Sequence, residues 1–107
     1  MQFSLIVRIP PADSRRLAVM REFMAAAIEQ GHTIRQCFFQ GAGVIAAADT
    51  KNLAAWQRVA NETGAELLLC SQAVEEHKVE TFEPFAIGGL GALVEAAVRS
   101  DRVVSFV

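Results

Sequence analysis

Two cysteines are the residues of this chain best suited to covalent chemistry. Cys70 ends the short apolar run Glu66–Leu69, and the residue after it, Ser71, is of a type that often caps a helix. The first turn of a helix carries unpaired backbone N–H groups and a partial positive charge, which favour a thiolate over a thiol. We therefore predict that Cys70 is a reactive, catalytic cysteine. The alternative is that it only packs as a small apolar residue at the end of a core strand.

The second cysteine, Cys37, lies inside the apolar run Thr33–Phe39, where we expect it to pack. The two cysteines form no CxxC pair and have no histidine at a ligand spacing. The sequence therefore predicts neither a disulfide framework nor a metal site, and both thiols are expected to be reduced.

No histidine or carboxylate stands at a spacing that would give Cys70 a general base. His77 follows Cys70 by two helical turns, about 10 Å along a helix axis, which is too far for proton transfer. His32 precedes the second apolar run and is expected at the opposite end of a parallel sheet. Glu75 and Glu76 are expected to form a solvated helix face.

A glycine cluster, Gly88-Gly89-Leu90-Gly91, precedes the last helical pattern. Glycines before a helix can let backbone N–H groups approach a phosphate, so a small-molecule or nucleotide-binding module is one possible reading. The cluster has neither the G-x-G-x-x-G pattern nor the Lys-Ser/Thr of a P-loop. We favour tight packing of this helix against the rest of the protein.

Apolar runs with strand character alternate with segments of helical periodicity along the chain. The expected strands are Gln2–Ile9, Thr33–Phe39, Glu66–Cys70 and Arg102–Val107. The expected helices run from Asp13 or Ser14 to Gly31, from Asn52 to Gly64, from Ser71 to about His77, and onward from Leu90. The segment Lys78–Ile87 contains Pro84 and two phenylalanines without a clear period, and we predict a loop there.

This alternation predicts one α/β domain spanning residues 1–107. Its expected architecture is three-layered and flavodoxin-like, with a central parallel sheet of four or five strands covered on both faces. Such a fold serves many activities, so it does not by itself name the function.

The composition narrows the partners that the protein can have. Ten Lys and Arg face twelve Asp and Glu, a formal net charge of −2, so we expect no direct nucleic-acid binding. Hydrophobic residues make up 52% of the chain, and 7 of its 107 residues are glycine. Together they exceed the roughly 45–50% that apolar residues and glycine usually make up in soluble domains. This apolar excess predicts a subunit interface. The N-terminal run has no basic leader, and no apolar stretch approaches about 18 residues, so we expect a cytoplasmic protein without a membrane anchor.

Four segments together resemble the DsrE/TusD sulfur-relay family: GGLGALVEAAVRSDRVVSF at the C-terminal end, FFQGAGV, AWQ and AELLLCSQAV. The resemblance covers most of the chain in matching order. Two stretches, between FFQGAGV and AWQ and between Cys70 and the glycine cluster, are shorter than in the better-known relay subunits. Glu75 and Glu76 stand where a basic pair is common in that family.

The resemblance implies a DsrEFH-like fold and a sulfurtransferase or persulfide-carrier activity. By its place in the motif, Cys70 matches the cysteine that accepts sulfur as a persulfide, and Cys37 matches no functional residue. Family members pass sulfur from protein donors to protein acceptors, toward 2-thiouridine in tRNA or in dissimilatory sulfur oxidation, within homo- or hetero-oligomers of related subunits. The competing hypothesis is a non-catalytic structural subunit of such an oligomer.

Persulfide transfer requires only an accessible thiolate on the protein. We therefore expect no metal and no bound cofactor. The loops at Gln40-Gly41 and Phe82–Phe85 are expected to shield the persulfide from water and oxidants.

Overall fold

Five strands form one parallel sheet in the order β4-β3-β2-β1-β5 in the computed structural model, which describes residues 1–107. The strands are β1 (Gln2–Val7), β2 (Thr33–Phe39), β3 (Glu66–Cys70), β4 (Phe85–Gly88) and β5 (Arg102–Phe106). Every neighbouring pair in the sheet is parallel. The predicted α/β class is confirmed, with five strands in its parallel sheet.

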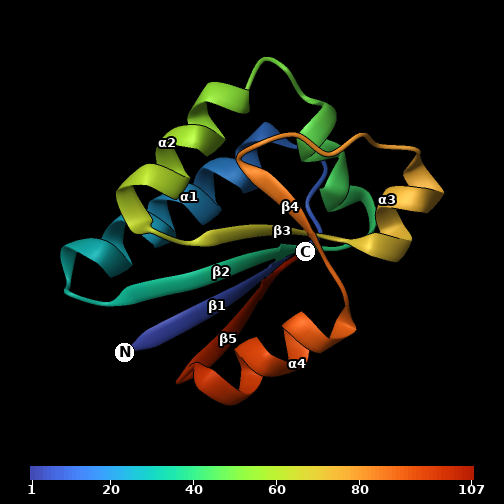
Figure 1. Ribbon diagram of the computed structural model, residues 1–107. Coiled ribbons are helices and arrows are strands. Elements are labelled where there is room, and N and C mark those ends of the chain that lie inside the picture. The colour runs from blue at the N-terminus through green and yellow to red at the C-terminus, as the bar shows by residue number, and fades with distance from the viewer.

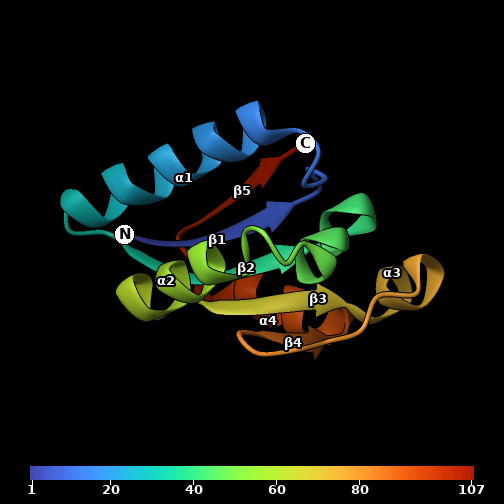
Figure 2. The ribbon, with the colours of Figure 1, turned by 90° about the horizontal axis from the view of Figure 1, so that it is seen from above.

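Helices cover both faces of this sheet. They are α1 (Ser14–Glu29), the 3-10 helix η1 (Gly41–Ala48), α2 (Leu53–Thr63), α3 (Ser71–His77) and α4 (Leu90–Arg99). Figures 1 and 2 show α1 and α2 on one face, α4 on the other, and α3 with η1 beyond the ends of the strands. The chain steps in one direction from β1 to β4 and then returns across the sheet to β5. Because such crossovers are right-handed, the return passes over the opposite face.

The main core lies between the sheet and helices α1 and α2. It receives alternate side chains of the three central strands, because successive residues of a strand point to opposite faces. These are Leu5 and Val7 of β1, Cys37 and Phe39 of β2, and Leu67 and Leu69 of β3. The ring of Phe39 meets Trp56 of α2 and Phe85 of β4 edge-on, with centroids 5.2 and 5.4 Å away.

Two helix ends form as the sequence predicts, and a third differs. The Asp13 carboxylate accepts a hydrogen bond from the backbone N–H of Arg16 at 3.2 Å, and Gly64 ends α2 at φ +70°, a conformation that suits glycine. Asn52 occupies the predicted N-cap of α2, but its side chain donates to the carboxylate of Asp49 at 2.6 Å and makes no capping bond.

The segment predicted as a loop, Lys78–Ile87, holds a strand in its last part. β4 spans Phe85–Gly88 and pairs with β3. The sequence did not predict this strand because its residues do not alternate between buried and exposed, as those of a half-buried strand do. Ala86 and Ile87 are adjacent and both exposed. β4 lies at the edge of the sheet and forms hydrogen bonds with β3 alone. Pro84, directly before it, also reads as a loop residue.

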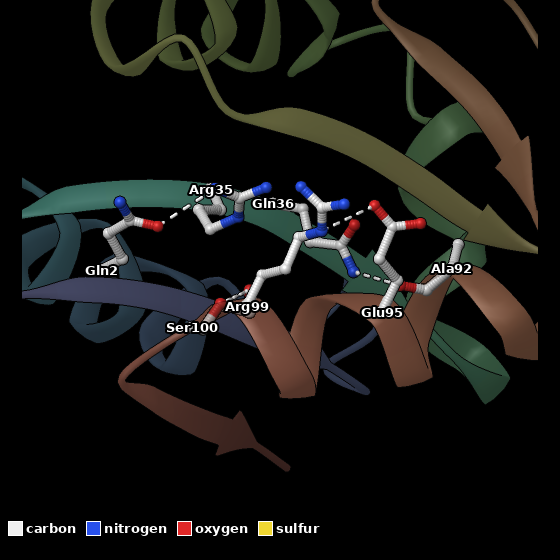
Figure 3. Close-up of polar contacts among 8 residues, drawn as sticks. Gln2, Arg35, Gln36, Ala92, Glu95, Arg99 and Ser100 are labelled. Carbon is white, nitrogen blue, oxygen red and sulfur yellow. Dashed lines mark hydrogen bonds and ion pairs between the residues drawn. The ribbon is translucent and has the colours of Figure 1, made fainter.

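Polar contacts hold α4 on the other face of the sheet. The side chain of Gln36 in β2 donates to the carbonyl oxygen of Ala92 at 3.4 Å, and the hydroxyls of Ser4 and Ser100 lie 2.5 Å apart. Figure 3 shows Gln36 of the sheet facing Ala92 of α4, with Ser100 at the end of that helix. Ser4 and Gln36 are buried, so these bonds satisfy groups that would otherwise be costly to bury.

None of the helices combines the length and apolar character needed to cross a membrane.

Candidate functional site

Cys70 lies at the carboxyl edge of the sheet, at the junction between a strand and a helix. It is the last residue of β3, pairs with Gly88 of β4, and occupies the N-cap position of α3. Ser71, the residue predicted to cap this helix, is instead its first residue. The side chain of Cys70 makes no capping hydrogen bond and is half-buried. Its sulfur is therefore free for other contacts.

A hollow of about 250 Å³ opens beside Cys70. The segments that follow β1 and β2 line it from one side, and β3 with α3 line it from the other. Its lining residues are Arg8, Gln40, Gly41, Cys70, Gln72, Ala73 and Glu76. Ligands of parallel α/β proteins commonly bind at this edge, beyond the carboxyl ends of the strands.

Backbone hydrogen bonds beyond the strand ends position this lining. The N–H of Arg8 donates to the carbonyl oxygen of Phe106, and the N–H of Gln40 donates to that of Val7, both at 2.9 Å. η1 then starts directly over the end of β1. A Cβ at Gly43 would stand 2.3 Å from the Val7 carbonyl oxygen, so this close approach requires glycine.

Arg8 is the site residue that sequence reasoning missed. It directly follows β1, and its side chain lines the same hollow as Cys70. One signal could have found it, because Arg8 is a charged residue between the apolar run of β1 and Ile9. The carboxyl ends of parallel strands meet at one edge of a sheet, so that charge had to lie near the ends of the other strands.

Cys37 occupies an environment opposite to that of Cys70. It is fully buried in β2, and this burial raises the pKa of its thiol from 9.0 to about 12. A thiolate in an apolar core lacks solvation, so the neutral form is strongly favoured. The prediction that Cys37 packs in the core is confirmed.

The structure brings neither histidine to the hollow beside Cys70. His32 lies at the amino end of the sheet, where its Nδ1 is 2.9 Å from the N-terminal amine of Met1. His77 is exposed at the end of α3. Glu75 and Glu76 are both exposed, as predicted, but Glu76 also lines the hollow.

Of the two loops predicted to shield the persulfide, only Gln40-Gly41 lines the hollow beside Cys70. Phe82–Phe85 contributes no lining residue, and Phe85 is buried in the core against Phe39 and Trp56. The large apolar ring of Phe85 gains more from core burial than from a position over an exposed hollow, so this expectation was wrong.

The glycine cluster packs tightly at one position. A Cβ at Gly88 would lie 3.2 Å from two carbons of Leu68 and 3.4 Å from the ring of Phe38, whereas Gly89 and Gly91 have open space around them. Gly88 therefore allows β4 to approach these two side chains. This contact supports the packing interpretation of the cluster.

A larger hollow lies elsewhere in the molecule. It measures about 560 Å³ and is lined by residues of α1 and α2, without a cysteine or histidine. Its size alone gives no chemistry, whereas the smaller hollow contains a thiol and a guanidinium. We therefore take the hollow beside Cys70 as the candidate functional site.

Comparison with known proteins identifies the family of the chain and agrees with its fold. The sequence profile of the DsrE/DsrF-like family matches residues 1–106. The chain belongs to the DsrE/DsrF-like family. The resemblance found in the sequence motifs is thus confirmed.

Several known proteins are similar to the chain over its full length. It is 31% identical to the sulfurtransferase TusD of Cronobacter sakazakii and 30% identical to that of Klebsiella pneumoniae, each alignment covering 99% of this chain and all of the relative. The ychN protein of E. coli has the same fold, with a TM-score of 0.76 at 19% identity over 99% of this chain and all of that one.

The alignments with the TusD relatives contain gaps in this chain. The alignments extend over 128 residues, of which this chain can supply no more than its own 107. This difference agrees with the shorter stretches noted in its sequence.

Proposed function

We propose that this protein is a sulfur-relay protein that accepts sulfur on Cys70 as a persulfide and passes it to a thiol of another protein. The observation that carries the proposal is the position of Cys70, a half-buried thiol beside an open hollow, in a chain whose other thiol is fully buried. Similarity to TusD sulfurtransferases over the full length supports the reaction class.

The reaction needs only the thiolates of the partners. The Cys70 thiolate attacks the outer sulfur of a donor persulfide, a new bond forms between the two sulfurs, and the donor leaves as a thiolate with the electron pair of the broken S–S bond. A thiolate of the acceptor then takes the outer sulfur from Cys70 in the same way. The transferred sulfur keeps its oxidation state, so no oxidant or reductant is consumed.

The partners in this proposal are proteins. The acidic charge balance disfavours direct tRNA binding, so sulfur bound for tRNA 2-thiouridine would pass through a further protein, as would sulfur in a sulfur-oxidation pathway. Two unpaired thiols fit the reducing cytoplasm, where we place the protein.

We also propose that the protein works as an oligomer. α4 exposes Leu90, Val94 and Val98, three large apolar side chains spaced four residues apart on one helix face. This surface also favours the second candidate function, a structural subunit in which Cys70 carries no sulfur.

Intact mass after incubation with glutathione persulfide distinguishes the two functions. We expect the native protein to gain one sulfur atom, Cys37→Ser to gain it as well, and Cys70→Ser to gain none. Thermal unfolding and sedimentation of Cys70→Ser must match those of the native protein, so that a loss of loading reports the missing thiol. Sulfur uptake by the folded Cys70→Ser variant would exclude the relay mechanism on this cysteine.

A further inference from the structure

The guanidinium of Arg8 lines the hollow beside Cys70 without a bonding partner. Its side-chain nitrogens take part in no hydrogen bond or ion pair, whereas Arg16 and Arg99 both pair with carboxylates. Its Nη2 lies 3.4 Å from the position that a Cβ would have at Gly41, so the absent side chain leaves this space to the guanidinium. Five N–H donors are thus available at the edge of the hollow.

The charge around the hollow comes from two side chains. Arg8 and Glu76 are the charged residues among its lining, and no ion pair joins them. The carboxylate of Glu76 accepts a hydrogen bond from the side chain of Gln72, four residues earlier in α3, at 3.4 Å. The positive charge of Arg8 therefore remains available to an anion in the hollow.

The anion that the proposed reaction produces there is a persulfide. A persulfide is a stronger acid than its parent thiol, so its outer sulfur is readily ionised near neutral pH. This sulfur lies one bond beyond the Sγ of Cys70, and Cys70 lines the same hollow as Arg8. A guanidinium is always charged and can direct several donors at such an anion.

We propose that Arg8 binds the anionic outer sulfur of the Cys70 persulfide, an inference that rests on the proposed sulfur-relay function. When Cys70 takes sulfur from a donor, the outer sulfur forms its bond to Sγ and the donor departs as a thiolate. The proton of the new persulfide passes to that thiolate or to water, and Arg8 stabilises the charge left on the outer sulfur. Glu76 opposes this effect, because its carboxylate repels the same anion.

The ionisation of the loaded persulfide tests the proposal directly. The protein is loaded with glutathione persulfide, and the absorbance of the persulfide anion is followed against pH at low salt, where charges act over a longer range. In Arg8→Met we expect the midpoint of ionisation to rise by about one pH unit and loading to slow about tenfold. Arg8→Lys should recover part of both losses, and Glu76→Gln should lower the midpoint.

A matched control removes the same charge elsewhere. Arg58 lies in α2, lines the other hollow, and can be changed to Met without altering the site. An unchanged midpoint and loading rate in Arg58→Met, with both changed in a folded Arg8→Met, support the proposal. If the native protein loads Cys70 and Arg8→Met behaves identically, Arg8 has no such role and the relay function stands. If the native protein takes up no sulfur on Cys70, the proposed function itself fails.

Discussion

At the scale of single residues, the two cysteines differ because of where the chain buries them. Cys37 is enclosed in β2 and Cys70 stands at the end of β3, although both strands are short and apolar. Only one of them can therefore meet another protein's thiol. The buried one should affect stability instead, in a way that depends on pH.

Alkaline conditions should destabilise the fold through Cys37. Its thiol has a pKa of about 12 when folded and 9.0 ordinarily, so the unfolded chain loses this proton first as pH rises. The contribution to the free energy of unfolding should be constant below about pH 9 and should fall by about 1.4 kcal/mol per pH unit from there toward about pH 12. Urea unfolding measured at a series of pH values would show this fall.

Two variants isolate that effect. In Cys37→Ala, the free energy of unfolding should no longer fall steeply between about pH 9 and pH 11. The small cavity that this substitution leaves lowers stability by an amount that does not depend on pH. Cys70→Ala should retain the steep fall. The chain has no tyrosine, so no phenol titrates in the same range. Equal slopes for the native protein and Cys37→Ala would contradict the account of a buried, neutral thiol.

At the scale of elements, the junction between β4 and α4 depends on close packing at one glycine. Gly88 approaches Leu68 and Phe38 across the sheet, and Gly91, in the first turn of α4, faces open space. The two glycines are three residues apart, but only Gly88 lies where a Cβ atom would be crowded.

Alanine at these two positions should have effects of opposite sign. Gly88→Ala forces its Cβ against Leu68 and should lower the free energy of unfolding by about 1–2 kcal/mol. Gly91→Ala adds a methyl group in open space on a helix and should raise it by up to about 1 kcal/mol. Chemical denaturation of both variants provides the measurement. Equal destabilisation by both would contradict the packing interpretation of the glycine cluster.

At the scale of the whole molecule, the face that carries α4 is the one expected to meet another subunit. Figure 1 shows α4 as the helix that covers this face of the sheet. Leu90, Val94 and Val98 are 72%, 56% and 79% exposed, so this stripe is in contact with solvent in the isolated chain. A second copy that covered the stripe would remove apolar area from water.

The oligomeric state should respond to a charge placed on this stripe. Sedimentation equilibrium of the native protein at micromolar concentration should give a mass above that of one chain, and Val98→Lys should lower it. Val19→Lys is the control, because Val19 is an equally apolar residue on α1 with 56% exposure. A native protein that sediments as a monomer, or an assembly unaffected by Val98→Lys, would exclude this face as the interface between copies.

Local signals in the sequence predicted most elements and singled out Cys70 as the candidate reactive cysteine. Asp13 and Gly64 mark helix ends through bonds and conformations that involve only a few neighbouring residues. The position of Cys70 at the end of an apolar run, together with the family motifs, was likewise readable from residues next to one another in the chain. Such features follow from short-range geometry, which the order of residues specifies.

The tertiary structure decided what depends on residues distant in the chain. β4 forms because β3 offers it a ladder of backbone bonds, and its own residues carry no alternating pattern that predicts a strand. Arg8 and Cys70 line the same hollow because β1 and β3 run parallel and end at the same edge of the sheet, with the segment after β2 between them. Phe85 enters the core because Phe39 and Trp56 provide an apolar surface there. These arrangements arise from strand order and packing, which no local pattern encodes.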